Sequence, residues 1–198
     1  GILRNGTDGV DGLVAPNGIA FSPNGEHVYL TAGWGGNAVS WYDRNATSGA
    51  LTWQGVLKDD SGGVDGLFSA GAIVASSDGK FVYVTAYDDD AVSWYERNAT
   101  SGALSWLGVL KDGQGGVDGL DGANGLVLSE DEKFLYVGAM VDSTIAWFAR
   151  NETTGGLTFQ NLVRDGAGGV DGLGAVTSIA ASVDGKYIYA TSQHDHSV

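Results

Sequence analysis

The sequence contains no cysteine, so neither disulfide bonds nor thiolate metal sites can form in this chain. Positive charge is scarce as well: 10 lysines and arginines stand against 24 acidic residues, and the formal net charge is −14. Binding to nucleic acid or to an anionic membrane is therefore not expected, because both need a basic surface. No apolar run approaches the roughly 20 residues that a membrane-spanning helix requires.

Proline is also rare, with only two residues, whereas 33 of the 198 residues are glycine. The glycines do not recur at every third position, which excludes a collagen helix. Hydrophobic residues make up 43% of the chain, enough to build a core, so a disordered acidic tail is excluded too. The chain begins at Gly1 without a signal peptide, and we expect a processed, trimmed or incomplete product.

The whole sequence consists of four tandem copies of one unit of about 53 residues. The copies cover residues 1–54, 55–107, 108–160 and 161–198. Each contains Val-Asp-Gly-Leu at the end of a Gly/Asp-rich loop, followed by short segments rich in β-branched and aromatic residues. In the first copy these segments are residues 18–22, 28–31, 39–42 and 51–53. Asn-Gly and Asp-Gly turns between such segments predict hairpins, so each copy is expected to form a four-stranded antiparallel sheet.

Both faces of each predicted sheet carry apolar side chains: Val39 and Trp41 point one way and Tyr42 the other. Stacking such sheets around an axis covers both faces, so we predict an all-β, single-domain β-propeller over residues 1–198. The last copy lacks its outer strand, and the first residues supply a spare one. We expect the N-terminal strand to complete the last blade, in cis as four blades or in trans within a larger ring. A continuation of the chain is the remaining alternative.

Two motifs carry a resemblance to a known family. Ser76 to Thr85 reads Ser-x-Asp-Gly-Lys-x-Val-Tyr-Val-Thr, and Asn98 to Leu104 reads Asn-Ala-Thr-Ser-Gly-Ala-Leu. This pattern resembles the repeats of lactonase-like β-propellers, which include 6-phosphogluconolactonase-like and YVTN-type proteins. The resemblance implies seven blades and, for the enzymes of the group, Arg, His and Glu side chains that converge on a central channel. No such set can be assigned in this sequence.

The four copies differ most in the loop between the second and third strands. Antiparallel order places this loop and the Gly/Asp-rich loop at one end of each sheet and the two tight turns at the other. A scaffold that keeps its turns and varies one rim often carries function on that rim, although drift of unconstrained loops is an equal alternative. The candidate ligand-binding residues on these loops are Trp34, Asn37, Tyr87, Asp88, Asp90, Asp142, His194 and His196.

Trp34 is a candidate for stacking on a ring-shaped ligand, because it lies among glycines in one copy only. His194 and His196 alternate along a predicted strand end, which allows a metal pair, although an exposed polar loop is the favoured interpretation. Asp88 to Asp90 lie near the repeated aspartates of the Gly/Asp-rich loops and could bind calcium. Local capping of those loops is the simpler explanation, and no cofactor or metal is assigned.

Several recurring residues are interpreted as structural. Trp41, Trp94 and Trp147 recur at one strand position and are expected in the core between blades, rather than as sugar-stacking platforms. The Asn-x-Thr sequons at Asn45, Asn98 and Asn151 fit tight-turn chemistry, whereas Asn5 begins a fourth sequon that could be glycosylated in a secreted protein. Arg44, Arg97 and Arg150 occupy the same tight turn and are also expected to be structural.

Three functions remain possible. The favoured one is a non-catalytic propeller, extracellular or secreted, that binds a small molecule or a glycan on the variable rim. The second is a lactonase-like hydrolase or isomerase, although no nucleophile motif is present. The third is a structural or assembly module that forms homo-oligomers through its open end strands.

Overall fold

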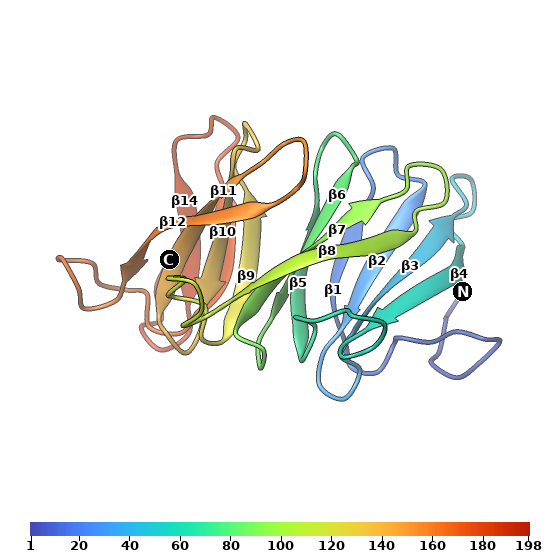
Figure 1. Ribbon diagram of the computed structural model, residues 1–198, viewed down its shortest axis with the longest axis horizontal. Coiled ribbons are helices and arrows are strands. Elements are labelled where there is room, and N and C mark those ends of the chain that lie inside the picture. The colour runs from blue at the N-terminus through green and yellow to red at the C-terminus, as the bar shows by residue number, and fades with distance from the viewer.

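The computed structural model describes residues 1–198 as a succession of antiparallel sheets (Figure 1). Sheet 1 contains β1 (Pro16–Phe21), β2 (His27–Ala32), β3 (Ala38–Arg44) and β4 (Leu51–Lys58). Sheet 2 contains β5 (Ala70–Ala75), β6 (Phe81–Ala86), β7 (Ala91–Arg97) and β8 (Leu104–Lys111). Sheet 3 contains β9 (Ala123–Leu128), β10 (Phe134–Ala139), β11 (Thr144–Arg150) and β12 (Leu157–Arg164). Sheet 4 contains only β13 (Val176–Ala181) and β14 (Ile188–Ser192). None of these elements is a membrane-spanning helix.

Each fourth strand runs through a predicted repeat boundary. Strand β4 continues across residues 54 and 55, because a β-bulge opposite Trp41 and Tyr42 lets the strand bend without ending. Trp41 pairs with Gly55 and Tyr42 pairs with Trp53, which leaves Gln54 as the additional residue. Glycine at position 55 leaves room for the Trp41 ring, which an added Cβ would overlap.

The core lies between neighbouring sheets, as the two apolar faces predict. One cluster joins Tyr29 and Val39 of sheet 1 to Val82, Val84 and Tyr95 of sheet 2. A second cluster joins sheet 2 to sheet 3 in the same way.

The tryptophans at the recurring strand position belong to this core. Trp41 and Trp94 pack against the two clusters, which confirms their interpretation as inter-sheet residues. Trp147 is half-buried.

The tight turns follow the chemistry expected of their sequence. The side-chain oxygen of Asn45 accepts hydrogen bonds from the backbone N–H groups of Thr47 and Ser48 at 3.0 and 2.8 Å. Asn98 and Asn151 make the same pair of bonds. The asparagine of each motif therefore has a local structural role, as predicted.

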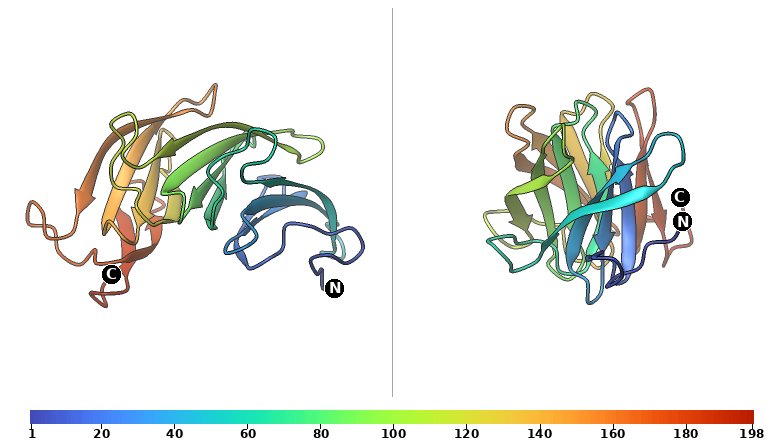
Figure 2. Two further views of the ribbon diagram at one scale, coloured as in Figure 1. Left: turned by 60° about the horizontal axis from the view of Figure 1, so that its bottom comes forward. Right: turned by 90° about the vertical axis from the view of Figure 1, so that its right-hand side faces the viewer.

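The four sheets form an open arc with the two termini at opposite ends (Figure 2). Residues 1–15 contain turns and bends but no strand, so the expected N-terminal strand is absent here. Ile2 is 75% exposed, because no strand lies beside it to accept pairing. Sheet 4 has only an isolated bridge between Ser192 and Ser197 beyond its two strands. The repeated all-β fold is confirmed, whereas closure in cis does not occur in this structure.

A buried polar contact recurs at the interface between sheets. The hydroxyl of Tyr29 donates to the backbone oxygen of Gly102 at 3.0 Å and accepts from Nε of Arg97 at 2.6 Å. Tyr83 repeats this contact one sheet later, and burial raises its pKa to about 12 despite the nearby guanidinium of Arg150. The structural interpretation of Arg97 and Arg150 is therefore confirmed.

His27 makes the first of these interfaces pH-sensitive. Burial and the positive charge of Arg97 lower the pKa of His27, although Asp43 and Glu26 act in the opposite direction. Nδ1 of His27 lies 2.9 Å from Nη2 of Arg97, so the neutral ring is the form that fits. Because the pKa of His27 is lower in the folded chain, the unfolded chain binds a proton first as the pH falls below 6.5. The contribution of neutral His27 to the free energy of unfolding is therefore complete above pH 6.5 and is lost as the pH falls below that value.

We expect the free energy of unfolding to fall more steeply for the native chain than for His27→Phe between about pH 7 and about pH 5. Phenylalanine is the matched replacement because Phe81 takes the same place one sheet later, where its ring lies 5.6 Å from the guanidinium of Arg150. Urea unfolding across this range measures the difference, and parallel profiles for the two proteins would contradict it.

Candidate functional site

The two kinds of loop predicted to share one rim do lie together. The backbone N–H of Tyr87, in the loop between β6 and β7, donates to the backbone oxygen of Ser69 at 3.1 Å. Ser69 ends the Gly/Asp-rich loop that precedes β5. Asp89 accepts a hydrogen bond from the backbone N–H of Phe68 at 2.9 Å. The variable loops are therefore held on the Gly/Asp-rich loops by specific hydrogen bonds.

Three of the predicted ligand-binding residues meet in one hollow of about 280 Å³ on this rim. Trp34 comes from sheet 1, and Tyr87 and Asp88 come from sheet 2. The hollow is completed by Asn17 of β1, Gly33, Ser69 and Asn124 of β9. Strands β1, β5 and β9 contact one another in sequence, so the hollow opens where the first strands of three sheets meet.

Asp88 connects the two variable loops of the hollow. Its Oδ2 accepts from the indole N–H of Trp34 at 3.2 Å and from the hydroxyl of Ser69. Trp34 is nevertheless 80% exposed, because only its N–H edge is engaged. The loop that carries it contains Gly35 at φ +78°, a conformation that favours glycine. An indole face open to solvent beside a carboxylate and amide groups is suited to stacking and hydrogen bonding with a polar ring.

Asn37 and Asp90 lie outside this hollow and join successive sheets. Asn37 accepts from the backbone N–H of Ser69 at 3.0 Å, and Asp90 accepts from that of Gly122 at 2.9 Å. Both residues have positive φ, and so do the equivalent Ser143 and His196. This position is a left-handed turn in every copy, so the choice of Asn37 and Asp90 there has a structural explanation.

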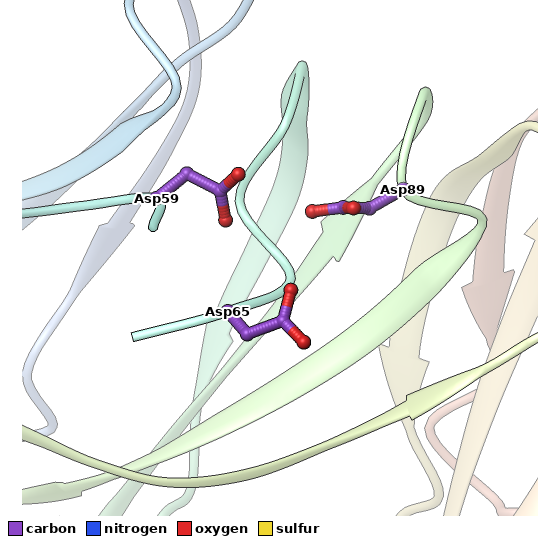
Figure 3. A group of neighbouring side chains, drawn as sticks. All are labelled: Asp59, Asp65 and Asp89. Atoms are coloured by element: carbon purple, nitrogen blue, oxygen red, sulfur yellow. The ribbon is translucent and has the colours of Figure 1, made fainter. Parts of the chain in front are cut away.

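Asp142 belongs to one of two carboxylate clusters on the rim. Asp59 and Asp65, in the loop between β4 and β5, and Asp89, in the loop between β6 and β7, point toward one another (Figure 3). The equivalent cluster one repeat later consists of Asp112 and Asp118, in the loop between β8 and β9, and Asp142, in the loop between β10 and β11. Burial raises the pKa of both Asp59 and Asp142.

A positively charged side chain at the end of the outer strand forms ion pairs with each carboxylate cluster. Nζ of Lys111 lies 2.7 Å from Asp65 and 2.8 Å from Asp89. Burial opposes the charge on Lys111, but its hydrogen bonds to these carboxylates outweigh burial and raise its pKa. Arg164 makes the corresponding contacts with Asp118 at 2.9 Å and Asp142 at 3.3 Å. A lysine or arginine therefore supplies the positive charge at the place where the sequence suggested calcium.

His194 and His196 do not form the pair that the sequence suggested. Residues 193–196 form a turn rather than a strand end, so the alternation that would place both rings on one side is absent. His196 has φ +53°, and both side chains are exposed. The clusters that could hold a metal ion do not include them.

Asn17, Ser69 and Asn124 line the hollow but were not identified from the sequence. Comparing the four copies would have shown a signal, because Asn17 and Asn124 share a strand position that is Gly71 in sheet 2 and Thr177 in sheet 4. A polar residue that varies at one position of an otherwise apolar strand is unusual for a core position.

The family assignment follows from comparison with known proteins. A family model described as lactonase, seven-bladed β-propeller, matches residues 10–162 and 89–198. The chain belongs to this family. No curated protein matches the sequence of this lactonase-family chain.

Solved structures agree with the fold. A proposed 6-phosphogluconolactonase from Bacteroides uniformis is 19% identical, with a TM-score of 0.72 over 91% of this chain and 48% of that one. The periplasmic gluconolactonase of Pseudomonas aeruginosa is 23% identical, with a TM-score of 0.64 over 77% of this chain and 40% of that one. Hydrazine synthase from Kuenenia stuttgartiensis is 22% identical, with a TM-score of 0.65 over 95% of this chain and 45% of that one. This lactonase-family chain thus spans about half the length of these structures or less, and the fold is shared by proteins with different names.

Proposed function

We propose that this lactonase-family propeller binds a neutral polyhydroxylated ring, such as a sugar or a sugar lactone, in the rim hollow without transforming it. The observation that carries the proposal is the 80% exposed indole of Trp34 beside Asp88 in a hollow of about 280 Å³. A sugar ring offers an apolar face for stacking and hydroxyl groups for the carboxylate and amides around it.

The charge around the hollow favours a neutral ligand over a phosphorylated one. The residues that line the hollow include the carboxylate Asp88 but no lysine, arginine or histidine. The whole chain carries a formal net charge of −14. A phosphate group would be repelled by this charge and would find no cation to pair with.

The chemistry of the hollow favours binding over hydrolysis. Opening a lactone requires a base that activates water and a donor that stabilises the developing oxyanion. Asp88 is the one carboxylate in the hollow, and the hydrogen bonds from Trp34 and Ser69 already engage it. Those bonds favour a positioning role over the abstraction of a proton.

Lactone hydrolysis is the second candidate, supported by the family match. Asp88 would then be the base, with Ser69 or Asn124 as the oxyanion donor. Turnover of a panel of sugar lactones, abolished by Asp88→Asn, would favour the hydrolase over the binding protein.

Replacing Trp34 with alanine is expected to weaken ligand binding by about fivefold to a hundredfold, because stacking on an aromatic ring contributes about 1–3 kcal/mol. Trp34→Phe keeps a ring but loses the N–H bond to Asp88, so its loss is expected to be smaller. The ligand is first found on an array of neutral saccharides and then titrated by two-dimensional NMR.

His194→Ala is the matched control, because His194 holds the equivalent loop position in sheet 4 and lies outside the hollow. It is expected to bind like the native chain. Equal affinity of Trp34→Ala and the native chain would contradict the proposal, and so would perturbed resonances confined to another surface.

A further inference from the structure

Lys111 lies outside the rim hollow, but a continuous set of contacts connects it to the residues that line the hollow. It is the last residue of β8, and its side chain is only 21% exposed. Its Nζ lies 2.7 Å from Asp65 of the Gly/Asp-rich loop and 2.8 Å from Asp89 of the loop between β6 and β7. One lysine therefore joins the two kinds of loop that form the rim.

Asp89 connects this ion pair to the segment that borders the hollow. Its Oδ1 contacts Lys111, and its Oδ2 accepts from the backbone N–H of Phe68. The backbone oxygen of Phe68 accepts in turn from the N–H of Asp88 at 3.3 Å, and the hydroxyl of Ser69 donates to the Asp88 carboxylate. The position of Asp88 therefore depends on how its loop is held against Phe68 and Ser69.

The loop that carries Trp34 has no such ion pair of its own. Lys58, the counterpart of Lys111 in sheet 1, contacts one carboxylate instead of two. Gly36 occupies the place that Asp89 has in sheet 2. The indole of Trp34 is instead bonded to the neighbouring sheet, through the carboxylate described above. Its orientation therefore depends on the loop between β6 and β7.

Lys111 also balances the charge of the first carboxylate cluster. Asp59, Asp65 and Asp89 each place an oxygen within 4.8 Å of the others (Figure 3). Negative charges at this separation repel one another, and solvent screens Asp89 poorly because it is only 15% exposed. Asp59 is fixed by a hydrogen bond from the backbone N–H of Leu67 at 2.9 Å. Without the ammonium group, displacement of Asp89 and its loop is the way to relieve the repulsion.

We propose that Lys111 is a positioning residue for the rim hollow. By neutralising the cluster, it holds the loop between β6 and β7 in the arrangement in which Asp88 aligns the indole of Trp34. The dependence of ligand affinity on Lys111 rests on the proposed function, whereas the alignment of Trp34 is a property of the ligand-free chain.

Lys111→Met tests the proposal, because it keeps an unbranched side chain and removes the charge. In the ligand-free variant, we expect the nitrogen–proton NMR signal of the Trp34 indole to move or broaden as the bond to Asp88 is lost in part of the population. That signal is identified among the six tryptophans by its absence in Trp34→Phe.

The affinity of Lys111→Met for the saccharide selected on the array is expected to fall about threefold to tenfold. A binding-competent population of about 10–30% raises the apparent dissociation constant by the inverse of that fraction. Lys111→Arg is expected to behave like the native chain, because Arg164 makes the corresponding pair of contacts one repeat later.

Arg164→Met is the matched control. Arg164 contacts Asp118 and Asp142, and neither these residues nor the loop between β10 and β11 lines the hollow. The variant is expected to keep both the native Trp34 signal and the native affinity. Equal changes in Arg164→Met and Lys111→Met would indicate a general loosening of the rim and would overturn the proposal.

Asp89→Asn breaks the same ion pair from the loop side and carries the test if Lys111→Met does not fold. An unchanged Trp34 signal in the folded variants would overturn the positioning role, and so would a displaced signal with unchanged saccharide affinity. A displaced signal in a chain whose native form binds no saccharide would support the alignment of Trp34 by Lys111 and contradict the proposed function instead.

Discussion

Replacing Arg97 with alanine is expected to lower the free energy of unfolding by about 2–4 kcal/mol, because hydrogen bonds to a charged group contribute about 1.5–3 kcal/mol each. The buried guanidinium donates to the Tyr29 hydroxyl and the Gly79 oxygen and contacts His27. Alanine leaves a cavity between sheets 1 and 2 and deprives His27 of its partner. Burial of the charge itself is unfavourable, which keeps the expected loss below the sum of the bonds.

The matched control for this change is Arg44→Ala. Arg44 holds the same position in sheet 1 but has no tyrosine partner, so about 0.5 kcal/mol is expected. Urea unfolding measures the loss in both variants. Equal losses for the two variants would show that the contact between sheets does not stabilise the chain.

Replacing Gly102 with alanine is expected to destabilise the chain by about 2–5 kcal/mol, from a left-handed backbone cost of about 1–2 and an overpacking cost of about 1–3. Gly102 has φ +68°, and an added Cβ would overlap the imidazole ring of His27. Relief of this overlap would move the turn and lengthen the hydrogen bond from Tyr29 to the Gly102 oxygen.

Gly49→Ala isolates the backbone cost. Gly49 has φ +69° at the equivalent turn of sheet 1, but nothing lies within 4 Å of an added Cβ. A loss of about 1–2 kcal/mol is expected there. The difference between the two variants in urea unfolding reports the packing between sheets 1 and 2, and the absence of a difference would contradict close packing at Gly102.

The four-copy comparison predicted the sheets well because strands and tight turns depend on local sequence. The turn asparagines and the half-buried Trp41 were interpreted correctly for this reason. The hollow was predicted only in part. Trp34, Tyr87 and Asp88 were singled out by their loops, but Ser69 and Asn124 enter it only through the packing of three sheets.

By itself, the sequence determined a succession of four-stranded units that must cover one another, because alternation and turn chemistry are encoded within each copy. Only the tertiary structure decided which loops meet and which carboxylates pair with Lys111 and Arg164. These outcomes depend on the distance and angle between sheets, which arise from side-chain packing across residues far apart in the chain.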